Sequence, residues 1–131
     1  MNMPATIGAV MRAEGPLLTP ATPIREAAAA LVSATASGAP VVDDTGALVG
    51  ILTQKDCFRA ALNASYYRQW TGTVGDVMSA TLTTLDAGTD IVTAGEAFLV
   101  HPHRLFPVLK DGKLVGVLHR SDLLAALLRL G

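Results

Sequence analysis

The sequence of 131 residues is long enough for one compact unit with its own hydrophobic core. Half of its residues are hydrophobic, but no apolar run approaches the roughly 18 residues of a membrane-spanning helix, so we expect no membrane insertion. The formal net charge of −1, without a basic cluster, argues against nucleic acid as a partner.

The single cysteine, Cys57, excludes an internal disulfide and is typical of a reducing compartment. The N-terminal residues show no charged segment followed by an apolar one, so we expect no secretory signal and a cytoplasmic protein. Cys57 itself is expected to be a small buried hydrophobic residue rather than a reactive thiol.

In chain order, the first half predicts a short helix, a short strand, a long helix, a β-hairpin and a second long helix. The expected ranges are 6–11, 17–19, 23–37, 39–43 paired with 48–53, and 54–70. Thr22 and Pro23 are typical of a helix start, and Gly38 is typical of a left-handed helix end. On the last helix, one face is expected to carry Phe58, Ala61, Leu62 and Ser65.

The second half repeats this order. The stretch GALVGILTQKD begins at Gly46, and its near copy GKLVGVLHRSD begins at Gly112, an offset of 66 residues. Upstream of the hairpins the offset is 67, and the difference of one residue is a shorter hairpin turn. We therefore predict an α/β (α+β) fold of two β-α-β-β-α repeats, residues 1–72 and 73–131. The repeats are expected to pack through their sheets about a pseudo-twofold axis into one compact module.

Both copies end in a strand that runs directly into a helix with an aspartate in its first turn. Backbone amides at a helix start lack partners inside the helix and carry the positive end of its dipole, so a phosphate or a hydroxyl-rich ligand is favoured there. Thr53 and Asp56 occupy this place in the first half. The same two residues also fit a capping box that needs no ligand.

Across nearly its full length, the sequence resembles a tandem pair of CBS domains, often called a Bateman module. The resemblance is carried by these stretches: VM and TPIREAA in the first half, GAPVVDDTGALVGILTQKD, VGDVM, and FPVLKDGKLVGVLHRSD. It implies a regulatory module that binds AMP, ATP, S-adenosylmethionine or a related adenosine compound in the cleft between the repeats. It also implies a homodimer that signals occupancy to a regulated enzyme or transporter, and no catalysis, since the sequence shows no catalytic constellation.

The resemblance assigns the ligand contacts of the first half. Thr53 with the first free amides would hold a phosphate, and Asp56 would accept hydrogen bonds from ribose hydroxyls. Backbone groups would meet the adenine edge, with the first short strand closing the pocket near Leu18 and Thr19. The backbone positions are Gly38, Ala39, Pro40 and Val41.

The second half departs from this pattern. Asp122 keeps the aspartate, but His119 stands in place of the hydroxyl, and Leu105-Phe106 replace the slimmer Gly38-Ala39. Phe106 would fill space that a base uses elsewhere, and Arg120 or Arg104 would supply phosphate contacts instead.

Other readings stay open. His101, His103 and His119 suggest a metal site, although no cysteine or carboxylate lies near them in sequence. The aromatic group Tyr66, Tyr67 and Trp70 suits packing or a dimer contact better than base stacking. The last helix is apolar over more than one face, which indicates a dimer surface around Leu128. The main alternative function is a degenerate CBS pair that binds no nucleotide and serves as a protein-interaction scaffold.

Overall fold

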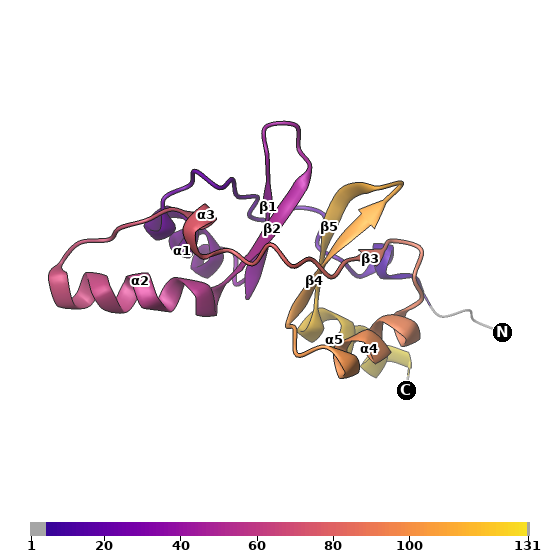
Figure 1. The fold of residues 1–131 in the computed structure, drawn as a ribbon. Coiled ribbons are helices and arrows are strands. Elements are labelled where there is room, and N and C mark those ends of the chain that lie inside the picture. Colours follow the sequence, from indigo (N-terminus) through magenta and orange to yellow (C-terminus); the bar gives the residue numbers. More distant parts are fainter. Residues whose placement is uncertain (1–4, 131) are drawn as a thin grey trace. The chain divides into compact units, whose positions relative to one another are not determined.

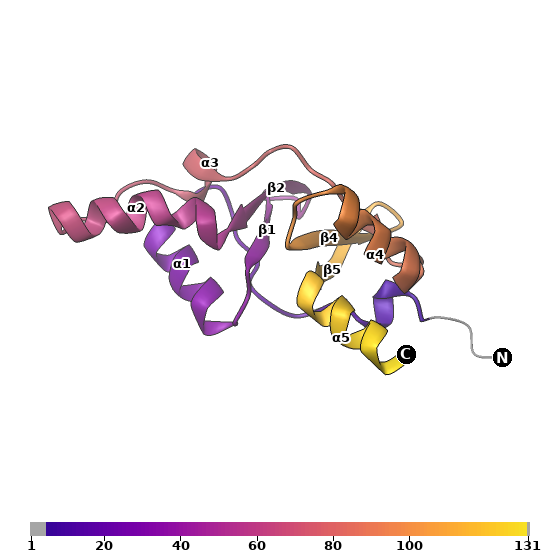
Figure 2. The ribbon, with the colours of Figure 1, turned by 90° about the horizontal axis from the view of Figure 1, so that it is seen from below.

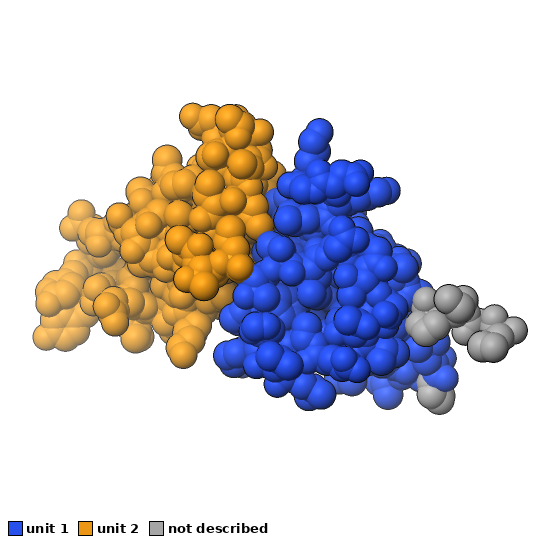
Figure 3. Space-filling model, turned by 45° about the vertical axis from the view of Figure 1, so that its right-hand side comes forward, with its two compact units in different colours: residues 1–14, 83–131 blue, residues 15–82 orange. Residues whose placement is uncertain are grey.

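The computed structural model describes residues 5–130 (Figure 1). Within them the chain is mixed α/β, with five α-helices, one 3₁₀ helix and two small sheets, which confirms the predicted fold class. The chain divides into two compact units, coloured separately in Figure 3. Unit 1 consists of residues 1–14 and 83–131, and unit 2 consists of residues 15–82.

Unit 2 is built on a two-stranded antiparallel hairpin with two helices packed beside each other. Its elements are α1 (Ile24–Ser33), β1 (Gly38–Val42), β2 (Leu48–Thr53), α2 (Gln54–Tyr67) and α3 (Val74–Val77). Leu18 pairs in parallel with Val41 on one side of the hairpin, and Ser79 pairs antiparallel with Ile51 on the other. The short strand predicted at 17–19 is therefore a single bridge at Leu18.

Unit 1 repeats this plan with a three-stranded sheet. Its elements are the 3₁₀ helix η1 (Ile7–Ala9), β3 (Leu85–Asp86), α4 (Ile91–Val100), β4 (Leu105–Lys110), β5 (Lys113–His119) and α5 (Arg120–Leu130). β3 pairs in parallel with β4, β4 pairs antiparallel with β5, and Arg12 pairs antiparallel with Val117. Helices α4 and α5 lie side by side in Figures 1 and 2, as α1 and α2 do in unit 2.

The structural repeat follows the sequence offset closely. Helix α4 starts and ends 67 residues after α1, and the irregularity in each hairpin falls at matching places, Val41/Val42 and Val108/Leu109. The packed units nevertheless differ from the predicted boundary at residue 72. Residues 5–14, which open the first sequence repeat, pack in unit 1 with the hairpin of the second repeat, and residues 73–82, which open the second repeat, pack in unit 2 with the hairpin of the first. In each unit, the backbone of this segment completes the hydrogen bonding of the second hairpin strand.

The ends of α1 differ from the prediction. The helix begins at Ile24 with Pro23 as its cap, and the Thr22 hydroxyl instead accepts from the amide of Thr19 at 3.2 Å. It ends at Ser33, where Thr35 takes a left-handed conformation with φ of 50°. The Ala36 amide donates to Leu31 and the Thr35 amide to Val32, which is a Schellman end. Gly38 is consequently free to begin β1.

Each unit has its own apolar core. Unit 2 buries Leu31, Val41 and Leu52 completely, and unit 1 does the same with Val108 and Leu118. The buried side of α2 consists of Cys57, Ala60 and Ala64. The face predicted from the sequence lies on the outside of α2, where Phe58 and Leu62 are 59% and 65% exposed.

A methionine packed on a strand glycine recurs in both units. A Cβ built at Gly50 would lie 2.6 Å from the Met78 sulfur, and one at Gly116 would lie 2.7 Å from the Met11 sulfur. Both methionines directly precede the residue that pairs with the second hairpin strand. Only glycine leaves room for this close approach.

We predict that Gly116→Ala lowers the free energy of unfolding by about 1–3 kcal/mol, because the new Cβ would also meet the Arg12 carbonyl oxygen at 2.8 Å. Urea unfolding followed by circular dichroism measures the loss. Gly15→Ala is the matched control, since a Cβ there meets nothing within 4 Å. Equal stability of the two variants would contradict the packing argument.

Candidate functional site

The strand-to-helix junction of unit 2 carries a complete capping box. The Thr53 hydroxyl accepts from the Asp56 amide at 3.3 Å, and Asp56 Oδ2 accepts from the Thr53 amide at 2.9 Å. Both residues are half-buried. Thr53 and Asp56 therefore form the capping box that needs no ligand, and α2 begins at Gln54 as predicted.

The capping box uses only one oxygen of Asp56. Among the described residues, Oδ1 of Asp56 has no hydrogen-bond partner, and no buried side-chain oxygen there is left unsatisfied. Oδ1 therefore reaches solvent. An ionised carboxylate oxygen held on a fixed side chain is a strong acceptor for ligand hydroxyls.

The amides at the start of α2 are largely occupied. The Gln54 amide donates to the Ser37 carbonyl at 2.9 Å, and the Asp56 amide donates to Thr53. Within residues 5–130, only the amide of Lys55 lacks a protein partner among the three. The predicted phosphate site at the helix start thus has one open amide instead of several.

Strand β1 lies next to this junction, since Gly38 is the register partner of Thr53. Gly38, Ala39, Pro40 and Val41 are all buried, and the Pro40 carbonyl already accepts from the Leu18 amide at 3.1 Å. Thr19 is exposed, and its hydroxyl lies 3.1 Å from that of Thr22. These predicted contact residues therefore all lie in unit 2, and all of them except Thr19 are buried.

Cys57 follows Asp56 and is 5% exposed, which confirms a small buried residue. Burial raises the pKa of the Cys57 thiol, and the neighbouring Asp56 charge raises it further, so the thiolate is disfavoured. Cys57 also lines an apolar cavity of about 240 Å³ between α1 and α2. The same cavity is lined by Phe58, Gln54 and Trp70.

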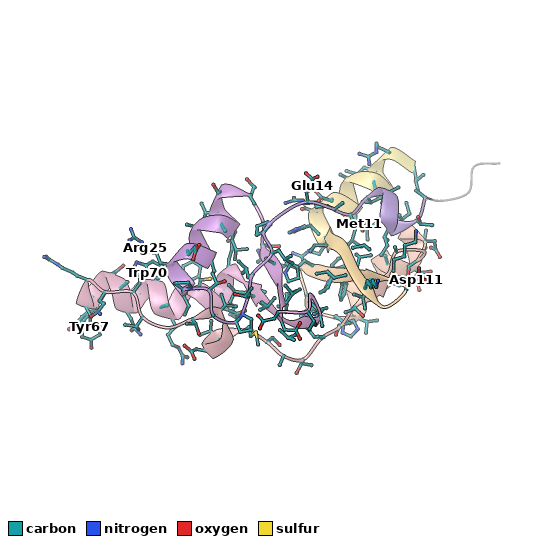
Figure 4. All side chains as sticks on the ribbon, turned by 90° about the horizontal axis from the view of Figure 1, so that it is seen from above. Met11, Glu14, Arg25, Tyr67, Trp70 and Asp111 are labelled. Atoms are coloured by element: carbon teal, nitrogen blue, oxygen red, sulfur yellow. The ribbon has the colours of Figure 1, made fainter. Side chains whose placement is uncertain are left out.

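The aromatic group at the end of α2 is split. Trp70 packs against the core of unit 2, whereas Tyr66 and Tyr67 are 82% and 71% exposed and contact each other edge to face at 4.9 Å. Figure 4 shows Tyr67 at the far end of α2 and Trp70 nearer α1. Packing is thus the role of Trp70.

The matching junction of unit 1 is arranged differently. Asp122 is held by Arg12, whose Nε donates to Oδ2 at 2.8 Å and whose Nη2 donates to Oδ1 at 3.4 Å. His119, in the place of Thr53, is only 4% exposed. Burial lowers the pKa of His119 and so does the Arg12 charge, against the opposing effect of Asp122.

Phe106 lies in the packing under α4. Its ring centroid is 4.5 Å from that of Phe98, and His101 and His103 meet it edge to face at 5.9 and 5.5 Å. Arg120 is exposed, and its amide donates to the carbonyl of Arg104 at 2.8 Å. His101 and His103 stack on each other at 5.4 Å.

Within residues 5–130, no group of three or more histidine, cysteine, aspartate or glutamate side chains is placed to hold a metal ion. Nor does that part of the chain contain a helix with the length and apolar character needed to cross a bilayer.

The sequence pattern of the CBS domain matches the chain twice, over residues 7–63 and 74–129. The chain belongs to the CBS domain family. The crystal structure of CBSX2 in complex with AMP has a TM-score of 0.81 and 29% identity, over 96% of this chain and 98% of that chain. A crystal structure of the CBS-pair protein CBSX2 from Arabidopsis thaliana gives the same TM-score of 0.81 at 28% identity, over 98% of this chain and 97% of that chain.

Two curated relatives come from Methanocaldococcus jannaschii. Methylated protein MJ0556 is 28% identical over 120 residues, which is 85% of this chain and 66% of that protein. Uncharacterized protein MJ1225 is 24% identical over 104 residues, which is 79% of this chain and 36% of that protein. The chain therefore spans between about a third and two thirds of the length of these relatives.

Sequence reasoning missed Arg12 as the partner of Asp122 in the second CBS domain. The two residues are 110 positions apart, and the sequence drew attention to Arg120 and Arg104 as phosphate contacts instead. The signal was present in the repeat, since Arg12 aligns with Ser79 at the offset of 67. That alignment places an arginine beside one junction and a serine beside the other.

We predict that the stability of the chain falls as pH is lowered through 6.5, the ordinary pKa of histidine, towards the lower folded pKa of His119. The unfolded chain binds the proton more readily than the folded one, so the loss approaches about 1.4 kcal/mol per pH unit at most. Urea unfolding at a series of pH values measures it. His119→Thr, which restores the residue of the first junction, should flatten this part of the curve, and parallel curves for the two proteins would contradict the assignment.

Proposed function

We propose that the chain is a regulatory module that binds an adenosine-containing nucleotide at the junction of Thr53 and Asp56 and signals occupancy to a partner. The observation that carries the proposal is the solvent-facing Oδ1 of Asp56 on a side chain already fixed by its capping box. The CBS domain family and the AMP bound to CBSX2 support an adenosine compound as the ligand class.

The geometry suits a ribose. Oδ1 of Asp56 would accept from a ribose hydroxyl while Oδ2 keeps its bond to the Thr53 amide. The Thr53 hydroxyl accepts from the Asp56 amide, so its own proton remains available to a phosphate or ribose oxygen. The open Lys55 amide adds one donor for phosphate, which favours AMP over ligands with more phosphates.

Occupancy would be passed on through the start of α2. The Gln54 side chain donates to the Ala36 carbonyl at 2.8 Å, and its amide donates to Ser37, so the start of α2 and the end of α1 are tied together. A ligand changes the population of an arrangement only if it binds that arrangement more tightly. We infer that the regulated partner, an enzyme or a transporter, contacts these helices.

The outer helix faces support a homodimer. Three large apolar residues of α1 and α2 are exposed, and each has an exposed apolar counterpart on α4 and α5 at the repeat offset. The pairs are Val32 and Leu99, Phe58 and Leu124, and Leu62 and Leu128. Exposed apolar side chains kept at matching places in both CBS domains are typical of an interface.

We predict that AMP raises the melting temperature of the protein and that Asp56→Ala removes this rise. Loss of a charged acceptor costs about 1.5–3 kcal/mol of binding, or at least a tenfold weaker affinity. Differential scanning fluorimetry with AMP, ATP and S-adenosylmethionine measures it. The matched control is Asp76→Ala, because Asp76 closes an equivalent box with the Thr73 amide at 2.9 Å. No rise with any of the three compounds would favour the scaffold alternative.

We also predict that Leu128→Asp converts a dimer to a monomer, since Leu128 is 72% exposed and a charge there cannot be buried cheaply. Multi-angle light scattering measures the mass. Leu17→Asp is the control, because Leu17 is 59% exposed but lies outside the helices. An unchanged mass for Leu128→Asp would place any dimer contact elsewhere.

A further inference from the structure

The aspartates at the two helix starts, Asp56 and Asp122, have different hydrogen-bond partners. Asp56 has one oxygen bonded to a backbone amide and one facing solvent. Asp122 has both oxygens engaged by the Arg12 guanidinium, at 2.8 and 3.4 Å. The two side chains occupy matching positions at the offset of 66, so the difference lies in their partners.

The position of Arg12 is set by its backbone. Its amide donates to the Val117 carbonyl at 2.9 Å, and the Val117 amide donates back at 3.0 Å, which joins Arg12 to strand β5. Met11, the residue before it, packs on Gly116. The guanidinium therefore extends from a fixed point beside the strand that leads to Asp122, instead of from a freely moving segment.

Ser79 occupies the matching place in unit 2. Its backbone pairs with Ile51 in both directions at 2.9 Å, and Met78 packs on Gly50. The Ser79 hydroxyl donates to the carbonyl of Thr81 at 3.4 Å. Asp56 instead accepts a hydrogen bond from the Thr53 amide. The backbone pairing beside both aspartates is thus the same, and the side chain at this place differs between the two units.

We propose that Arg12 acts as an internal ligand that closes the second CBS domain to ribose, so that the chain binds one adenosine nucleotide, in unit 2. A ribose hydroxyl is a neutral donor, and to reach Asp122 it would have to displace a charged donor that already meets both carboxylate oxygens. His119 adds to the closure, because a buried imidazole stands where the first domain has a hydroxyl. This inference rests on the proposed function of the first junction.

Asp56→Ala provides the background for the test, because it leaves unit 1 as the remaining candidate site. Isothermal titration with AMP should give one ligand per chain for the natural sequence and none for Asp56→Ala. Arg12→Ser in the Asp56→Ala background installs in unit 1 the residue that Ser79 supplies at the matching place in unit 2, and one AMP per chain should return. Adding Asp122→Ala to that double variant should abolish binding again.

The outcomes separate the two proposals. Two ligands per chain in the natural sequence, or one retained by Asp56→Ala, would overturn the closure by Arg12 while leaving nucleotide binding intact. Absence of binding by the natural sequence, with a gain in the Arg12→Ser double variant, would overturn the proposed function of the first junction and retain the role of Arg12. Far-ultraviolet circular dichroism verifies folding, and Arg12→Ala repeats the test with a second side chain. A folded double variant of either kind that binds no AMP would refute the proposal.

Discussion

The backbone pairing beside the second hairpin strand is the constraint on which both CBS domains depend. Ile51 pairs with Ser79 and Val117 pairs with Arg12, so each strand edge has its amide and carbonyl satisfied. The preceding methionine can pack there only because the strand offers a glycine. This pairing decides which side chain stands near the aspartate at the helix start.

A single scaffold therefore supports two electrostatic arrangements. In unit 2 the aspartate closes a capping box and keeps an oxygen towards solvent, whereas in unit 1 it forms an ion pair with a guanidinium. Arg12 and Asp122 are each 33% exposed, so solvent screens their attraction in part. In the proposed closure of this junction, the ion pair matters because it occupies the carboxylate acceptors of Asp122, and its contribution to stability is secondary.

Large apolar side chains are exposed on the outer faces of the helices. Helix α2 buries the small residues Cys57, Ala60 and Ala64, so its large apolar side chains Phe58 and Leu62 are exposed. Phe58 also lines the cavity between α1 and α2. A face of this kind is costly in a monomer and useful in an assembly. Ligand binding at the start of α2 and assembly through its outer face would then act on the same helix.

The sequence alone determined the repeat, the fold class, both hairpins and the helix start at Thr53, because these features follow from periodicity and from contacts within a few residues. It was less reliable at the end of α1, where Thr35 adopts the left-handed conformation expected of Gly38. Only the tertiary structure decided that the opening segment of each repeat completes the other unit. Arg12 reaches Asp122 across 110 positions, and such a pairing depends on the path of the whole chain instead of on local residue preferences.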